Sequence, residues 1–319
     1  MIKEFQYGIN ELAKNHDDPH WWRNRIEQRL IRPFHLNVYP KRTGSIRVME
    51  EPWDNLIILD ACRWDLFEEV VDTSKYDNYT TVKSLGSGTG EWTQQNFQDG
   101  EFGDTVYITS NPHTSRIAGD VFHHIEECWL DDFDEDIGTV HPEPIVEAAY
   151  EAYENFPNKR LIIHFMQPHH PFVRREATHY GGWKKDRAGN SNETDEWERP
   201  IHVWDALEMG SIDRKTVWEA YADNLRYVMG EVNKLVDSLP NRTVITSDHG
   251  NFLGERVFPV PVRLFGHTNG VRHPAVNRVP WATISGEDRE ITRGNVKKLE
   301  RKSNRVHERL KQLGYIDVD

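Results

Sequence analysis

Short apolar runs alternate with longer amphipathic segments along the chain. Between the third and fourth runs, apolar residues recur every three or four positions from Val217 to Leu239, which predicts one long amphipathic helix. Buried strands that alternate with helices are typical of a mainly parallel sheet covered by helices on both faces. The pattern therefore predicts an α/β fold, a three-layer α/β/α sandwich. The predicted strands span residues 56–59, 105–109, 161–165, 243–246 and 281–285.

The sequence contains no repeat, low-complexity tract or Gly/Ser linker, so we expect one main domain. Residues 1–52 are basic and aromatic and predict an N-terminal helix followed by an arm. Residues 53–290 carry all five predicted strands and form the main domain. Within it, the polar segment 173–212 is too long for a plain connection and predicts a lid-like insertion. Residues 291–319 predict a C-terminal amphipathic helix, because their valines and leucines share one face.

The charge of the chain excludes one class of partner. There are 52 acidic and 39 basic side chains, a net charge of −13, and no long Lys/Arg tract. Capture of a nucleic-acid backbone needs clustered cations, so we expect no nucleic-acid scaffold. The acidic excess resembles the solvated surface of haloarchaeal proteins, which work in a high-salt cytoplasm. Two cysteines form neither a disulfide framework nor a Cys-rich metal cluster.

The sequence also predicts where in the cell the protein is located. No stretch approaches the roughly 20 apolar residues that cross a bilayer. The polar N-terminal residues lack the basic-then-apolar layout of a secretory signal. We therefore expect a cytoplasmic protein without a transmembrane segment.

Two predicted strands end in acidic residues. Asp60 follows the first strand, and Asp248 with His249 follows the strand at 243–246. In an open parallel sheet, ligands bind outside the carboxyl ends of the strands. Taken alone, each Asp is as consistent with a turn or a helix cap. Together, two carboxylates and an imidazole suit a divalent cation such as Mn, Mg, Ca or Zn.

The second strand end carries a specific string. The segment from Thr246 to Glu255, TSDHGNFLGE, resembles the metal-binding Asp-His-Gly-x-x-Leu-Gly-Glu motif of sulfatase-like members of the alkaline phosphatase superfamily. Other pieces occur in the order found in that family. Residues 55–65 resemble its first strand and metal Asp, here Asp60, and residues 164–172 resemble its Pro-His-x-Pro-aromatic segment. The resemblance covers roughly residues 53–290 and implies an alkaline phosphatase-like catalytic domain, with Asp60, Asp248 and His249 as metal ligands.

The nucleophile departs from the sulfatase pattern. The sequence contains no Cys/Ser-x-Pro-Ser-Arg pentapeptide, so a formylglycine sulfatase is disfavoured. The Gly/Ser-rich turn at residues 84–92 runs into a predicted helix in the corresponding region. A hydroxyl at a helix start can attack phosphorus once a metal lowers its pKa. Register against the family pattern favours Ser87 and proximity to the helix favours Thr89, and either could instead be a capping residue.

Several histidines are site candidates. By the resemblance, His169 corresponds to a substrate-side histidine, and His267 stands where relatives place a Lys or His that contacts the transferred group. Secondary candidates are Arg63, His164 and His170. The usual second-metal ligands are not plainly encoded, so we expect one divalent cation, although His164, His169 and His267 could supply a second site.

The expected function is a metal-dependent hydrolase or transferase that acts on phosphate mono- or diesters through a Ser/Thr phospho-enzyme. One alternative is a sulfuric-ester hydrolase without formylglycine. Another is a non-catalytic, metal-dependent binder of an anionic glycan or lipid headgroup. The expected partner is thus a phosphorylated or sulfated small molecule, glycan or lipid headgroup. Trp183, Trp197 and Trp204 in the insertion could stack on a sugar or base, or could serve as packing anchors.

Overall fold

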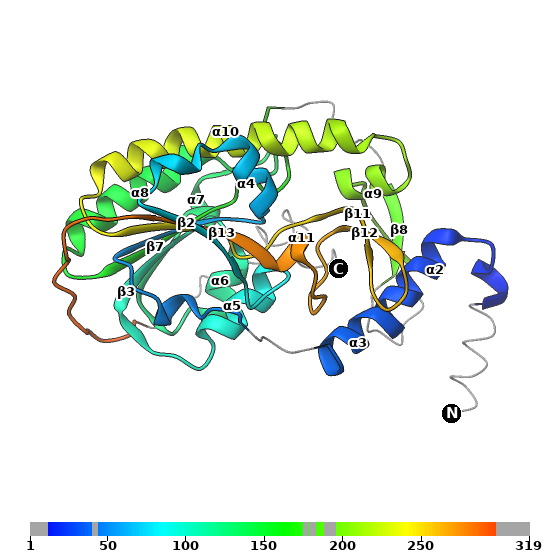
Figure 1. Ribbon diagram of the computed structural model, residues 1–319, viewed down its shortest axis with the longest axis horizontal. Helices are drawn as coiled ribbons and strands as arrows, with labels where there is room; N and C mark the ends of the chain where they lie inside the picture. The colour runs from blue at the N-terminus through cyan, green and yellow to red at the C-terminus, as the bar shows by residue number, and fades with distance from the viewer. Residues whose placement is uncertain (1–11, 40–43, 175–177, 179–182, 188–195, 298–319) are drawn as a thin grey trace.

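A seven-stranded sheet forms the centre of the molecule in a computed structural model (Figure 1). The structure describes residues 12–39, 44–174, 178, 183–187 and 196–297. The strand order is β2-β13-β10-β1-β7-β3-β4. In this sheet β13 runs opposite to the other six strands. The strands are β1 (Asn55–Leu59), β2 (Asn78–Lys83), β3 (Phe102–Thr109), β4 (Phe122–Glu127), β7 (Arg160–Phe165), β10 (Thr243–Thr246) and β13 (Arg278–Ile284).

Helices cover both faces of this sheet. On one face lie α4 (Trp64–Val70), α7 (Cys128–Asp131), α8 (Pro142–Asn155) and α10 (Arg214–Ser238); on the other lie α5 (Thr89–Phe97) and α6 (Pro112–Ala118). Strand β1 is buried throughout, and its side chains alternate between the two cores: Ile57 and Leu59 face the first, Leu56 and Ile58 the second. The predicted three-layer α/β/α fold is confirmed.

The five strands and the long helix expected from the sequence are present, together with strands that the sequence analysis missed. Strand β2 was missed because its residues are half exposed and mostly polar, and β4 because only two of its side chains are buried. The strands β11 (Phe252–Val257) and β12 (Val262–Gly266) form a hairpin directly after the Asp-His-Gly string. Shorter elements are η2 (Val48–Glu50), η3 (Thr73–Lys75), β5 (Phe133–Asp134), β6 (Thr139–Val140) and α11 (Pro274–Asn277).

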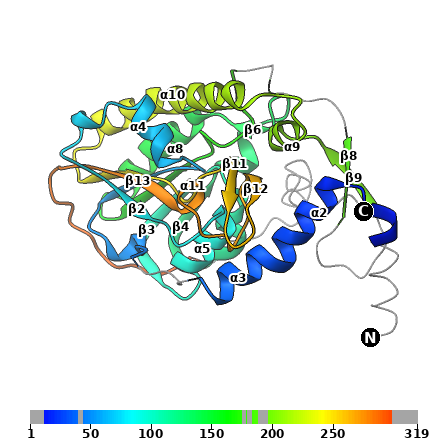
Figure 2. The same cartoon turned by 45° about the vertical axis from the view of Figure 1, so that its right-hand side comes forward.

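The N-terminal segment is helical, in the sequence α2 (Pro19–Ile26), a π-helical turn η1 (Glu27–Ile31) and α3 (Arg32–Asn37). It packs along the β11–β12 hairpin rather than on the central sheet (Figure 2). Ile31 is fully buried there, in a small third core with Val257 and Leu264. This contact ties the N-terminal helices to the part of the chain that follows the Asp-His-Gly string.

The lid-like insertion predicted at 173–212 contains the hairpin β8 (Trp183–Arg187) and β9 (Glu196–Pro200) and the helix α9 (Val203–Glu208). Trp204 packs in the main core against Phe172 and Tyr221, so it is a packing anchor. The side chains of Trp183 and Trp197 are outside the described part of the structure.

Residues 291–297 are not helical, and they run beside β3 and β4, where Gly294 N–H donates to Gly103 O. Most of the predicted C-terminal helix, residues 298–319, lies outside the described residues. No helix in the described ranges has the length and apolar character that crossing a membrane requires.

Candidate metal centre and active site

The carboxylates at the tips of β1 and β10 meet because these two strands are parallel neighbours. Asp60 and Asp248 are both fully buried. One oxygen of Asp248 is held by the backbone: Oδ1 accepts from Ala61 N at 2.9 Å and from His249 N at 2.8 Å. Ala61 adopts a φ of 58°, a left-handed conformation uncommon for residues with a Cβ, and the Tyr221 hydroxyl donates to its carbonyl. The backbone is thus bent to present Asp248.

One oxygen of each carboxylate has no hydrogen-bond partner among the described residues. Within the described part of the chain, Asp60 Oδ1 and Asp248 Oδ2 are buried without a hydrogen bond. Both face His249 Nε2, at 3.6 and 3.5 Å. His249 Nδ1 lies 2.9 Å from Gly250 O and so carries the hydrogen, which leaves the Nε2 lone pair directed at the two oxygens. Such an arrangement is costly without a cation and fits a divalent metal well.

His164 is a further ligand candidate beside these three residues. Its Nε2 lies 3.6 Å from Asp60 Oδ2 and is also buried without a hydrogen bond among the described residues. Its Nδ1 is 2.9 Å from the Tyr107 hydroxyl, which fixes the ring. Ligand atoms of Asp60, His164 and Asp248 lie within 4.8 Å of one another. A buried group that could bind a metal therefore includes a histidine that the sequence ranked only as secondary.

Asp60 is charged despite its burial. Burial alone would raise the pKa of its carboxyl, but the neighbouring imidazoles of His164, His169 and His249 outweigh that effect and hold the pKa well below its usual range. A carboxylate with two acceptor oxygens is the form that ligates a metal.

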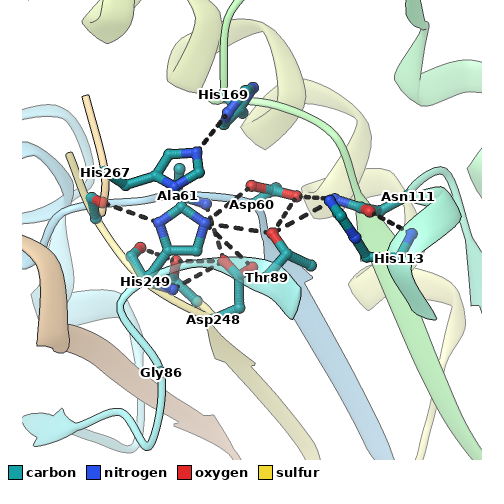
Figure 3. Close-up of polar contacts among 12 residues, drawn as sticks. Asp60, Ala61, Gly86, Thr89, Asn111, His113, His169, Asp248, His249 and His267 are labelled. Atoms are coloured by element: carbon teal, nitrogen blue, oxygen red, sulfur yellow. Dashed lines mark hydrogen bonds and ion pairs between the residues drawn. The ribbon is translucent and has the colours of Figure 1, made fainter. Parts of the chain in front are cut away.

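Thr89 stands at the first position of α5 and belongs to this group (Figure 3). Its Oγ1 lies 3.3 Å from both Asp60 Oδ2 and His249 Nε2. Gly88, which precedes Thr89, allows the turn to lie close to the loop that carries His267. A Cβ on Gly88 would lie 2.3 Å from Asn269 Oδ1 and 3.1 Å from His267 Nδ1. A hydroxyl is thus placed against the ligand atoms at a helix N-terminus, where anions are favoured.

Ser87, the other candidate nucleophile, is engaged elsewhere. Its Oγ lies 2.9 Å from Glu91 Oε2 and 2.9 Å from Thr268 O, and accepts from Gly270 N at 2.9 Å. Glu91 is itself charged: burial would raise the pKa of its carboxyl, but Arg272 and the surrounding N–H groups lower it. Ser87 therefore joins the start of α5 to the loop that carries His267, and the structure does not bring it to the carboxylates.

His169 and His267 lie together on the open side of the cluster. Their Nε2 atoms are 3.4 Å apart, and the His267 ring lies 4.5 Å from that of His249. His267 is an exposed residue, yet the surrounding protein desolvates its ring and lowers its pKa well below the usual range, with the His249 imidazole adding to the effect. A neutral ring here can donate one hydrogen bond toward an anion.

Two secondary candidates from the sequence make their described contacts with residues other than Asp60 and Asp248. His170 packs between His202 and Trp204, and burial lowers its pKa. Arg63 pairs with Asp65 at 2.6 Å and with Glu255 at 2.7 Å, and donates to Asn251 O at 2.8 Å. Arg63 thus clamps the two loops that carry the carboxylates to each other.

The sequence reasoning missed Asn111 and His113. Asn111 Nδ2 donates to Asp60 Oδ2 at 2.6 Å, while its Oδ1 accepts from His113 N and caps α6. Burial lowers the pKa of His113 to about 4, and the Arg116 charge contributes. Both residues follow β3, another parallel strand that ends at this edge of the sheet. Because ligands bind outside the carboxyl ends of parallel strands, the residues after the predicted strand at 105–109 could have been identified as site candidates.

The chain was compared with known proteins, and no family model and no curated protein sequence matches it. Among solved structures, the lipooligosaccharide phosphoethanolamine transferase EptA from Neisseria meningitidis has 13% identity and a TM-score of 0.49. The match covers 90% of this chain and 59% of EptA, so the chain spans less than two thirds of that protein. The periplasmic domain of the phosphoethanolamine transferase EptC from Campylobacter jejuni has 16% identity and a TM-score of 0.44, over 72% of this chain and 77% of that domain.

A third similar structure is a protein of the alkaline phosphatase superfamily from Vibrio parahaemolyticus, with 14% identity and a TM-score of 0.38, over 84% of this chain and 67% of that protein. The solved structures matched by the fold thus include a member of the superfamily that the Asp-His-Gly string resembles. No activity follows from likenesses at this level, and the function has to be argued from the site itself.

Proposed function

We propose that the protein is a metal-dependent phosphotransferase or hydrolase that acts on phosphate mono- or diesters, with Thr89 as its nucleophile. One observation carries this proposal. The Thr89 hydroxyl lies 3.3 Å from two candidate metal ligands, in a buried cluster in which one oxygen of Asp60 and one of Asp248 have no hydrogen-bond partner among the described residues. A structural capping threonine would not need two bare carboxylate oxygens and an imidazole lone pair beside it.

One group of residues would bind the metal ion, and a second group would contact the transferred phosphoryl group. Asp60, Asp248 and His249, with His164 as a further candidate, would hold a divalent cation, which supplies Lewis-acid chemistry that lowers the pKa of the Thr89 hydroxyl. Asn111 fixes Asp60 Oδ2 by its hydrogen bond and so sets the direction of the other oxygen.

The histidines face the transferred group. His267 can donate a ring N–H to a non-bridging phosphoryl oxygen, as an oxyanion hole does, and His169, whose Nδ1 is directed at His170 O, lies beside it and positions the ring. In the reaction, a bond forms between Thr89 Oγ1 and phosphorus while the bond to the leaving oxygen breaks. Water or an acceptor hydroxyl then attacks the phosphothreonine and releases Thr89.

The test is to trap and locate this phosphothreonine. The protein is incubated with Mn²⁺ and p-nitrophenyl phosphate or bis-p-nitrophenyl phosphate, quenched in acid, digested and analysed by mass spectrometry. We expect phosphate on Thr89, its loss in Thr89→Ala, and a turnover drop of roughly a thousandfold or more in that variant. Thr89→Ser keeps a hydroxyl and should keep part of the activity.

Parallel assays separate the alternatives. Phosphate on Ser87 would overturn the assignment of the nucleophile. Faster turnover of p-nitrophenyl sulfate than of either phosphate would favour the sulfuric-ester hydrolase. Tight vanadate binding without any turnover would favour the non-catalytic binder.

A further inference from the structure

Large apolar side chains are exposed together on the N-terminal helices and the adjacent hairpin tip. Phe258, at the tip of the β11–β12 hairpin, is 65% exposed and contacts Phe34 of α3 with ring centroids 5.3 Å apart. Leu30 is 53% exposed, next to the fully buried Ile31. We call this set the N-terminal apolar face; it consists of Trp22, Leu30, Leu36, Val38, Tyr39 and Phe258.

Arginines lie among these residues. Arg29 and Arg32 are exposed, and neither has an acidic partner within the described ranges. Trp22, Arg29 and Leu36, from the three successive helical elements α2, η1 and α3, are all exposed. A cationic, aromatic face is unusual on a chain whose net charge is −13. Its composition suits a surface that is both negative and apolar.

The face is rigidly connected to the candidate active site. Thr268, next to His267, donates to Glu27 Oε1 at 2.7 Å, and Leu36 packs on Gly270 with no room for a Cβ between them. His35 accepts from Arg272 N at 3.0 Å and donates to Phe258 O at 2.7 Å. The N-terminal segment therefore contacts the loop of His267 and also carries every member of the N-terminal apolar face except Phe258.

We propose that the N-terminal apolar face docks on the surface of a lipid bilayer that contains anionic lipids. Helices that lie in a bilayer interface combine Arg or Lys with Trp, Phe and Leu, and insert the apolar groups among the headgroups. Aromatic residues favour that depth because their rings are amphipathic. The N-terminal helices and the β11–β12 hairpin that carry the face lie at the edge of the molecule (Figures 1 and 2). This inference is independent of the proposed reaction.

Vesicle co-sedimentation of the full chain tests the proposal without any turnover measurement. We expect binding to vesicles of phosphatidylcholine with about 30 mol% phosphatidylglycerol, weak binding to phosphatidylcholine alone, and weakening at high salt. The pair Arg29→Glu and Arg32→Glu should reduce the partition constant at least about tenfold, since each charge near such a surface contributes. Leu30→Ser with Phe258→Ser should reduce it by a similar factor.

Matched controls are available elsewhere on the surface. Lys215→Glu, on α10, and Ile117→Ser, on α6, change an exposed cation and an exposed apolar residue outside the face and should leave binding unchanged. Thermal melting establishes that all variants are folded. Absence of binding to the anionic vesicles, or equal binding by the arginine reversals, would overturn the proposal. So would a dimer in light scattering that the same reversals dissociate, because the face would then join two copies of the chain.

Discussion

At the scale of single residues, the site is defined by polar atoms that lack partners. In the described part of the chain, Asp60 Oδ1 and Asp248 Oδ2 are buried without a hydrogen bond and directed at His249 Nε2. Each residue's second oxygen is fixed by hydrogen bonds from Asn111 or from the backbone. A buried charge without a partner is destabilising, so a cation bound at these oxygens would stabilise the fold.

Replacement of Asp248 by Asn separates metal binding from folding. The amide oxygen of the variant can keep both backbone hydrogen bonds, while an uncharged NH₂ group replaces the bare oxygen. For Asp248→Asn we expect Mn²⁺ affinity to fall at least about a hundredfold and metal-free stability to rise by about 1 kcal/mol. Titration calorimetry and urea unfolding measure the two effects. Asp213→Asn, at an exposed helix cap, is the control, and unchanged affinity in Asp248→Asn would contradict the assignment.

Whereas Asp248→Asn removes a charge from the site, a substitution of Asn111 can add one. Asn111→Asp keeps the cap of α6 through Oδ1 but puts a carboxylate oxygen where the amide now donates to Asp60 Oδ2 at 2.6 Å. We expect the metal-free protein to lose about 2–4 kcal/mol of unfolding free energy, part of it restored by Mn²⁺. Urea unfolding with and without Mn²⁺ is the measurement. If the variant and the wild type are equally stable without metal, the hydrogen bond between Asn111 and Asp60 is contradicted.

At the scale of elements, the sequence could predict the site residues only where the strand that leads to them has a recognisable pattern. The ends of β1 and β10 follow runs of aliphatic and β-branched residues, so Asp60, Asp248 and His249 could be proposed from the sequence. Strand β2 has an alternating, mostly polar pattern that does not stand out. The choice between Ser87 and Thr89 could not be made, because it depends on how the glycine-rich turn approaches Asp60 in space.

The start of α5 allows a matched pair of glycine substitutions. A Cβ on Gly88 would lie 2.3 Å from Asn269 Oδ1, in the His267 loop, whereas a Cβ on Gly90 meets nothing closer than 3.6 Å. Gly88→Ala should therefore displace that loop, with turnover reduced at least about tenfold and stability by about 1–3 kcal/mol. Gly90→Ala, inside the helix, should be neutral or stabilise by up to about 1 kcal/mol.

Kinetics of p-nitrophenyl phosphate turnover and urea unfolding would compare the two variants. The assignment of Thr89 and His267 to one site fails if Gly90→Ala loses as much activity as Gly88→Ala.

At the scale of the whole molecule, the N-terminal helices are joined to the rest through a buried histidine. Burial lowers the pKa of His35, the bond to Phe258 O opposes this, and the Arg272 charge lowers it further. Because the folded-state pKa is below the unfolded value of about 6.5, the unfolded chain binds the proton first. The contribution of His35 to the unfolding free energy is therefore fully present above about pH 6.5 and is lost as the pH falls toward the folded-state pKa.

We therefore expect the wild-type unfolding free energy to decrease as the pH falls below about 6.5. In His35→Gln the decrease should be smaller, although the variant starts from lower stability at neutral pH. Urea unfolding across this pH range measures both slopes, and parallel slopes would exclude His35 as the titrating group.

The sequence also predicted the order of the layers, since buried runs and one long amphipathic helix alternate along it. It could not predict that the N-terminal helices pack on the β11–β12 hairpin. That contact depends on Ile31, Val257 and Leu264, which are far apart in the chain and show no shared pattern.

A crystal structure of the Mn²⁺-loaded protein with vanadate, with anomalous diffraction to locate the ion, tests the central claim most directly. The account predicts manganese within about 2.0–2.4 Å of oxygens of Asp60 and Asp248 and of His249 Nε2, and Thr89 Oγ1 in line with vanadium. Manganese bound away from these atoms, or vanadate next to another hydroxyl, would contradict it.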